Sequence, residues 1–186
     1  MTGRLDSEVI IIGGGATGAG IARDCARRGL RTLLIERHDI ATGATGHHGL
    51  LHSGARYAVT DNESARECIS ENRILRHIAR HCIEPSGGLF ITLPEDDLAY
   101  QQTFITACQQ AGIEATPLSP QEALRREPAV NPTLLGAVQV PDGTIDPFRL
   151  TAANMLDARE HGAQILTGCE VTGLVRQGDR VCGVQV

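Results

Sequence analysis

Short apolar runs and one helical pattern alternate over the first 36 residues of the chain. Residues 8–13, EVIIIG, and residues 31–36, RTLLIE, are rich in aliphatic side chains, as is typical of parallel strands buried on both faces. Between them, apolar residues recur at helical spacing and share one helical face: Ile21, Ala22, Cys25 and Ala26. Gly29 is placed to end this helix. The pattern predicts a β-α-β unit with a parallel crossover.

The chain then leaves this repeat. A capping box of Thr60 and Glu63 predicts a long helix to about residue 82. Alternation over residues 88–94 predicts a strand, residues 97–111 predict a helix, and residues 119–130 contain a short capped helix stopped by Pro128. We expect residues 61–145 to form a helical, substrate-side insertion between a dinucleotide-binding part, residues 7–60, and a return to that part in residues 146–186.

The last third of the chain has clear turn and cap signals. Residues 134–146 predict a hairpin, with a turn at Pro141, Asp142 and Gly143. Asp146 caps the next helix, Pro147 takes its first position and Gly162 ends it. Strands around a Gln-Gly-Asp turn close the chain. Since it stops within an outgoing strand, we expect it to be the N-terminal part of a longer protein.

Composition narrows the class of protein. The net charge is −5 and no basic run occurs, which argues against nucleic acid as a partner. The longest early apolar run, residues 9–12, is far too short to insert into a membrane, and no signal peptide is evident. Six cysteines without C-x-x-C spacing predict reduced thiols in a cytoplasmic protein and no metal site.

The turn after the first strand carries a dinucleotide-binding signature. Gly13, Gly15 and Gly18 form G-x-G-x-x-G, and Glu36 ends the next strand 18 residues later. The glycines permit a tight turn, close approach to a pyrophosphate and close helix packing, while the carboxylate can accept bonds from ribose hydroxyls. The competing interpretation is a glycine-rich turn that binds nothing. NAD and FAD both fit the signature, but the glycine-rich loop after Glu36 and the break in the α/β repeat favour FAD.

Three motifs then carry a family resemblance. ERHD-x-x-x-GATG, HGLLHSGARY and PDGTIDPFRLT, in this order, resemble the FAD-dependent glycerol-3-phosphate dehydrogenases, and most of all the large catalytic subunits of the bacterial anaerobic enzymes. The resemblance implies an α/β, Rossmann-like FAD-binding domain of the glutathione-reductase and D-amino-acid-oxidase type, incomplete at its C-terminus. It also implies oxidation of sn-glycerol 3-phosphate to dihydroxyacetone phosphate, with electrons passed through partner subunits to membrane quinone. The protein would then be peripheral on the inner face of the cell membrane.

The resemblance also assigns roles to individual residues. FAD would be bound by residues of the signature and of the loop that follows it, together with one late position on a strand near the adenine: Gly13, Gly15, Ala16, Thr17, Gly18, Glu36, Arg37, Ala44, Thr45, Gly46 and Val171. Arg56 and Tyr57 would bind the substrate, and arginine suits a phosphate dianion because its planar fork makes two charge-assisted bonds. His52 is a candidate catalytic base, whereas His47 and His48 fit simple polar loop residues.

The chain departs from the family pattern in one loop. Residues 46–49, GHHG, lack an arginine and are one residue short, which would alter contacts along the cofactor. The alternatives to the dehydrogenase are a truncated, non-catalytic FAD-binding fragment and another amine or hydroxy-acid oxidase of the same fold.

Overall fold

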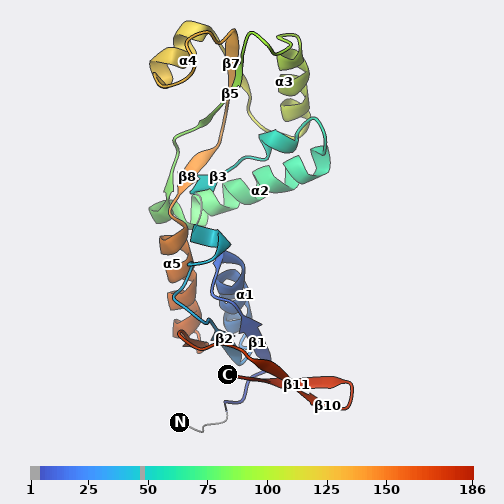
Figure 1. The fold of residues 1–186 in the computed structure, drawn as a ribbon, viewed down its shortest axis with the longest axis vertical. Helices are drawn as coiled ribbons and strands as arrows, with labels where there is room; N and C mark the ends of the chain where they lie inside the picture. Colours follow the sequence, from blue (N-terminus) through green and yellow to red (C-terminus); the bar gives the residue numbers. More distant parts are fainter. Residues whose placement is uncertain (1–4, 47–48) are drawn as a thin grey trace. The chain divides into compact units, whose positions relative to one another are not determined.

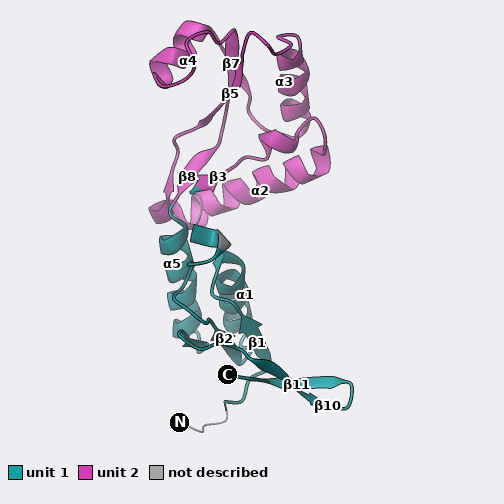
Figure 2. Ribbon diagram, in the orientation of Figure 1, with its two compact units in different colours: residues 1–49, 146–186 teal, residues 50–145 magenta. Residues whose placement is uncertain are grey.

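The computed structural model describes residues 5–46 and 49–186, which form two compact units (Figures 1 and 2). Unit 1 comprises residues 1–49 and 146–186, and unit 2 comprises residues 50–145. Among the described residues no helix is long and apolar enough to cross a membrane.

Unit 1 is built on a three-stranded parallel sheet. Its strands are β1 (Val9–Ile12), β2 (Thr32–Ile35) and β9 (Gln164–Leu166), in the order β1-β2-β9. All four residues of the central strand β2 are buried, as the unbroken apolar run predicts. The antiparallel hairpin of β10 (Gly173–Gln177) and β11 (Arg180–Gln185) confirms the predicted closing strands.

Helices α1 (Ala16–Arg27) and α5 (Pro147–Glu160) lie side by side in unit 1 (Figure 1). The buried face of α1 consists of small residues, Gly18, Ala19, Ala22 and Ala26, which allow close packing. Ile21 is 46 % exposed, so its predicted place on this face is wrong. A face centred on positions 19, 22 and 26 turns position 21 outward. Asp146 and Pro147 begin α5 as predicted, since the Asp146 side chain accepts a hydrogen bond from the Arg149 amide at 2.9 Å.

Unit 2 contains two small antiparallel sheets. One has the order β3-β8-β4, from β3 (Leu50–Leu51), β8 (Gly143–Ile145) and β4 (Ile83–Glu84). The other has the order β5-β7-β6, from β5 (Gly88–Thr92), β7 (Gly136–Val140) and β6 (Thr116–Leu118). The predicted hairpin is therefore wrong, because β7 and β8 belong to different sheets. Both edges of each strand are already paired with other strands, so neither is free to pair with its sequence neighbour.

Three α-helices and two short 3-10 helices complete unit 2. They are η2 (Ala55–Tyr57), α2 (Asn62–Ile78), η3 (Arg80–Cys82), α3 (Tyr100–Gln110) and α4 (Pro120–Arg126). The cap of α2 is Asp61, whose side chain accepts from the Ser64 amide at 3.1 Å, so the predicted Thr60–Glu63 box is wrong. A carboxylate one residue later competes better for the free amides of the first turn. The cap of α4 is the predicted one, with Ser119 and Glu122 forming a full capping box.

Candidate functional site

The glycine signature forms a tight turn that joins β1 to α1. Gly13 has a φ of +111°, and its amide donates to the Ile35 carbonyl at 2.8 Å. A Cβ at position 18 would lie 2.0 Å from the Gly13 carbonyl oxygen, far inside van der Waals contact. Glycine is therefore required at 13 by conformation and at 18 by space.

Helix α1 carries no negatively charged side chain in its first turn. Its cap is Gly15, which brings no side chain, and its first turn, which includes Thr17, holds no acidic residue. Partial positive charge from the helix dipole and the first amides is therefore not neutralised by a carboxylate of the helix itself.

The loop after β2 returns to this helix end. The Thr45 hydroxyl oxygen, within η1 (Ala44–Gly46), accepts from the Ala16 amide at 3.0 Å, and a Cβ on Gly15 would lie 2.8 Å from it. A Cβ on Gly46 would lie 2.7 Å from the Ala41 carbonyl. The structure thus brings the predicted residues of the first turn and of the loop together. His47 and His48 lie outside the described residues.

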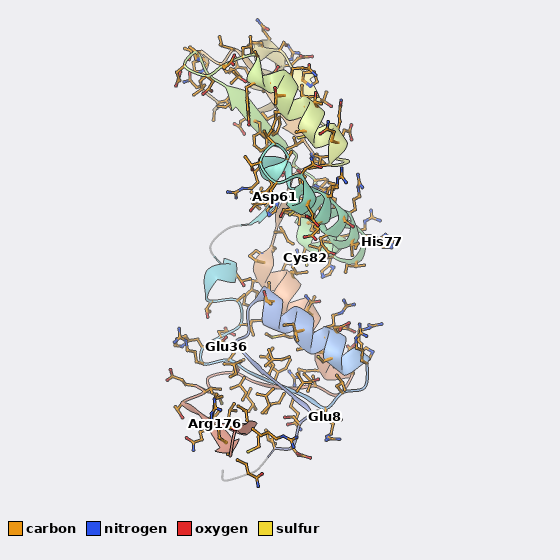
Figure 3. All side chains as sticks on the ribbon, turned by 90° about the vertical axis from the view of Figure 1, so that its right-hand side faces the viewer. Glu8, Glu36, Asp61, His77, Cys82 and Arg176 are labelled. Atoms are coloured by element: carbon orange, nitrogen blue, oxygen red, sulfur yellow. The ribbon has the colours of Figure 1, made fainter. Side chains whose placement is uncertain are left out.

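Glu36 lies directly after β2, where it is labelled in Figure 3. Its two carboxylate oxygens accept hydrogen bonds from the backbone amides of His38, at 2.8 Å, and Gly14, at 2.7 Å. These bonds, first from His38 and then from Gly14, hold the pKa of the Glu36 carboxyl below its ordinary value. The carboxylate stays ionised and couples the glycine turn to the end of β2.

A cavity of about 270 Å³ lies beside this carboxylate. It is lined by residues from the ends of β1 and β2 and from the loop after β9: Ile12, Gly13, Ile35, Glu36, Arg37, Cys169, Glu170 and Val171. The loop after β9 is joined to the end of β2 because the Cys169 amide donates a hydrogen bond to the Glu36 carbonyl at 3.0 Å. Val171 lies in this loop and not in a strand, which corrects the predicted strand position. Strand pairing resumes only at Gly173, two residues later.

The second group of predicted residues lies together in unit 2, in and before η2. The rings of His52 and Tyr57 make an edge-on contact with centroids 5.9 Å apart, and the Arg56 guanidinium carbon lies 5.2 Å from the Tyr57 ring centroid. Arg56 is exposed, and no carboxylate of the described residues forms an ion pair with it. His52 Nδ1 is buried without a hydrogen-bond partner in this part of the chain. The cluster offers a cation, a hydroxyl and an unsatisfied imidazole nitrogen.

Several residues that shape these regions escaped the sequence analysis. Cys169 and Glu170 line the cavity, yet only the pairing of β2 with β9 brings them there. Asn72 is buried on α2, with 2 % of its surface exposed. The Asp142 carboxylate, predicted only as part of a turn, accepts a hydrogen bond from the Ser53 amide at 2.6 Å. An asparagine among the helical positions of residues 60–82 was the available signal for Asn72. Within residues 5–46 and 49–186, no three His, Cys, Asp or Glu side chains gather as metal ligands would.

Comparison with known proteins identifies related sequences and structures. The chain is 77 % identical over 181 residues to one of the subunits of the anaerobic glycerol-3-phosphate dehydrogenase of Escherichia coli strain K12, a match covering 97 % of this chain and 33 % of that protein. The chain thus spans about a third of the length of this relative.

Solved structures show the same fold. The L-proline dehydrogenase of P. horikoshii superposes with a TM-score of 0.82 at 27 % identity, covering 96 % of this chain and 48 % of that one. The glycerol-3-phosphate dehydrogenase of Bacillus halodurans complexed with FAD superposes with a TM-score of 0.65 at 26 % identity, covering 96 % and 30 %. The predicted FAD-binding α/β fold is confirmed. The profile of the FAD dependent oxidoreductase family matches residues 8–186, and the chain belongs to that family.

Proposed function

We propose that the chain is the N-terminal part of a flavoprotein that oxidises sn-glycerol 3-phosphate to dihydroxyacetone phosphate. The observation that carries the proposal is the cluster of Arg56, Tyr57 and His52, in which an exposed guanidinium without a carboxylate partner among the described residues stands beside a phenol and an imidazole. A phosphorylated polyol is the substrate class that this set suits. The 77 % identity to part of a glycerol-3-phosphate dehydrogenase supports it.

The residues of unit 1 fit FAD. Gly15 and Gly18 have no side chain where Thr45 Oγ1 and the Gly13 carbonyl oxygen lie close, so the turn stays tight beside a helix end with no carboxylate in its first turn. In this proposal Gly13, Gly15, Ala16, Thr17 and Gly18 form the turn that holds the pyrophosphate at the positive end of α1.

The adenosine half of FAD is assigned to the cavity next to this turn. Glu36 holds the ribose with lone pairs that the Gly14 and His38 amides leave free, and Arg37 and Val171 lie along the adenosine. The loop of residues 44–46 (Ala44, Thr45 and Gly46) follows the dinucleotide. Bound FAD supplies the two-electron acceptor for the hydride of C2.

The residues of unit 2 bind and orient the substrate. The Arg56 fork pairs with two phosphate oxygens, and the Tyr57 hydroxyl donates to a third. His52 is the candidate to take the C2 hydroxyl proton, because its ring lies against Tyr57 in the same cluster.

We further propose that partner subunits pass the electrons to membrane quinone. The E. coli relative is by name one component of a larger enzyme, which supports the existence of such partners. The protein would then be cytoplasmic and peripheral on the inner face of the cell membrane.

The experiment uses the protein expressed from the complete reading frame, with FAD loaded. Anaerobic addition of glycerol 3-phosphate should bleach the flavin absorbance, whereas glycerol, which lacks the phosphate, and L-proline should not. Arg56→Lys should raise KM about tenfold or more while FAD content stays unchanged, because a point charge replaces a two-pronged donor. Bleaching by L-proline alone would favour an amine oxidase, and a protein that takes up no FAD would favour the non-catalytic alternative.

A further inference from the structure

A closed polar network in unit 2 surrounds the segment that leads into η2. Asn72, on α2, is 2 % exposed. Its side-chain NH2 donates to the carbonyls of His52, at 3.2 Å, and Leu51, at 3.4 Å, and its side-chain oxygen accepts from Arg76 Nε at 2.8 Å. Burying a side-chain amide costs free energy unless its hydrogen bonds are made, whereas an apolar residue at this position would need none. The Asn72 amide therefore depends on these particular partners.

Arg76 connects the amide to the turn between β7 and β8. Its Nη2 donates to the carbonyls of Pro141, at 3.0 Å, and Asp142, at 2.8 Å. The Asp142 carboxylate then accepts from the Ser53 amide at 2.6 Å. The network therefore returns to the segment at which it began, and it holds residues 51–53 by two carbonyls and one amide.

Glycines beside the network let its side chains pack directly against the backbone. A Cβ on Gly143 would lie 2.9 Å from Arg76 Nη2, and one on Gly88 would lie 2.8 Å from Asp142 Oδ2. Gly54 has a φ of +89°, and its Cβ would lie 2.6 Å from Cys68 Cβ on α2. The backbone from residue 51 to residue 54 is thus fixed on both sides immediately before Arg56 and Tyr57.

We propose that Asn72, Arg76 and Asp142 are positioning residues that set the direction of the His52 side chain and the entry of η2. The proposal rests on the proposed function, since it is the substrate contacts of His52, Arg56 and Tyr57 that the network would orient. A displacement of about 1 Å at such contacts lowers rates by roughly a hundredfold. A network that only joins α2 to the sheet would affect stability and leave the kinetics of the folded enzyme unchanged.

The test compares Asn72→Asp and Arg76→Lys with Arg73→Lys in the FAD-loaded protein from the complete reading frame. Asn72→Asp keeps the shape and the acceptor for Arg76, but it turns an oxygen toward the two carbonyls. Arg76→Lys keeps the positive charge but loses the guanidinium group, whose Nε and Nη2 donate to three acceptors. Arg73, on the same helix, donates to the Gly112 carbonyl at 2.7 Å and forms no hydrogen bond with residues 51–54, so it is the matched control.

The first measurement is hydrogen exchange of residues 51–57 in the native state. We expect at least tenfold faster exchange in Asn72→Asp and Arg76→Lys and no change in Arg73→Lys. The second is steady-state oxidation of glycerol 3-phosphate at equal FAD content, where kcat/KM should fall tenfold to a hundredfold in the first two variants only.

Each outcome decides one of the two proposals. Unchanged exchange in both test variants would overturn the network's role, and so would faster exchange with unchanged kcat/KM. If the wild-type protein does not oxidise glycerol 3-phosphate, the proposed function fails, while the exchange result still decides whether the network holds the segment.

Discussion

Replacing Gly18 with alanine places a methyl group 2.0 Å from the Gly13 carbonyl oxygen and 3.4 Å from Ile11 Cγ2. Ordinary contact begins near 3.4 Å, so the helix and the turn would have to separate by about 1.4 Å. Overpacking of this kind typically costs about 1–3 kcal/mol, and a backbone atom cannot rotate away as a side chain can. After the gain of about 1 kcal/mol from alanine in a helix, we expect a net loss of up to about 2 kcal/mol.

Gly20→Ala is the matched control, because it lies on the same helix with no atom within 4 Å of its would-be Cβ. It should gain about 0.5–1 kcal/mol from helix propensity. Urea unfolding followed by circular dichroism should therefore place Gly18→Ala below the wild type and Gly20→Ala at or above it. Visible absorbance should show less bound FAD in Gly18→Ala alone, since the turn of residues 13–15 moves. Equal midpoints and equal FAD content in the two variants would refute the argument.

Three further results are expected from the charged groups and thiols. Hydrogen bonds lower the pKa of the Glu36 carboxyl in the folded protein. The ionised carboxylate therefore stabilises the fold at pH values above the pKa of the unfolded state, and this stabilisation is lost as the pH falls through the lowered pKa of the folded state. The difference in melting temperature between wild type and Glu36→Gln should be largest near neutral pH and vanish in acid. Burial raises the pKa of the Cys108 thiol to about 11, so iodoacetamide should label it only after unfolding, while exposed Cys182 labels in the native state by peptide mass spectrometry. Asp157 pairs with Arg23 across α1 and α5, and Asp157→Asn should lower stability by about 1 kcal/mol or less, with a smaller loss at high salt in denaturant titrations.

Each of these has a result that would contradict it. A constant difference for Glu36→Gln from acid to neutral pH would exclude the linkage to its ionisation. Native labelling of Cys108 at the rate of Cys182 would mean that the core around α3 opens readily. A salt-independent loss for Asp157→Asn would mean that packing, and not charge, is responsible.

Much of unit 1 could be predicted from local sequence, as could some elements of unit 2. The strands β1 and β2, the glycine turn and the caps of α4 and α5 depend on residues a few positions apart, as at Ser119 with Glu122 and at Asp146 with Arg149. Backbone conformation and capping are short-range effects, so the chain carries them in its own order. The family motifs likewise depend only on residue type and spacing.

Strand partners and buried polar contacts could not be obtained in this way. Residues 134–146 have the alternation and turn of a hairpin, but β7 and β8 pair with strands far away in the chain. Ser53 and Asp142 are 89 positions apart, and Val171 lines the same cavity as Glu36 because β9 pairs with β2. Local propensity specifies which segments can form strands and helices, whereas the choice among partners depends on which edges and polar groups remain unsatisfied once the whole chain has packed.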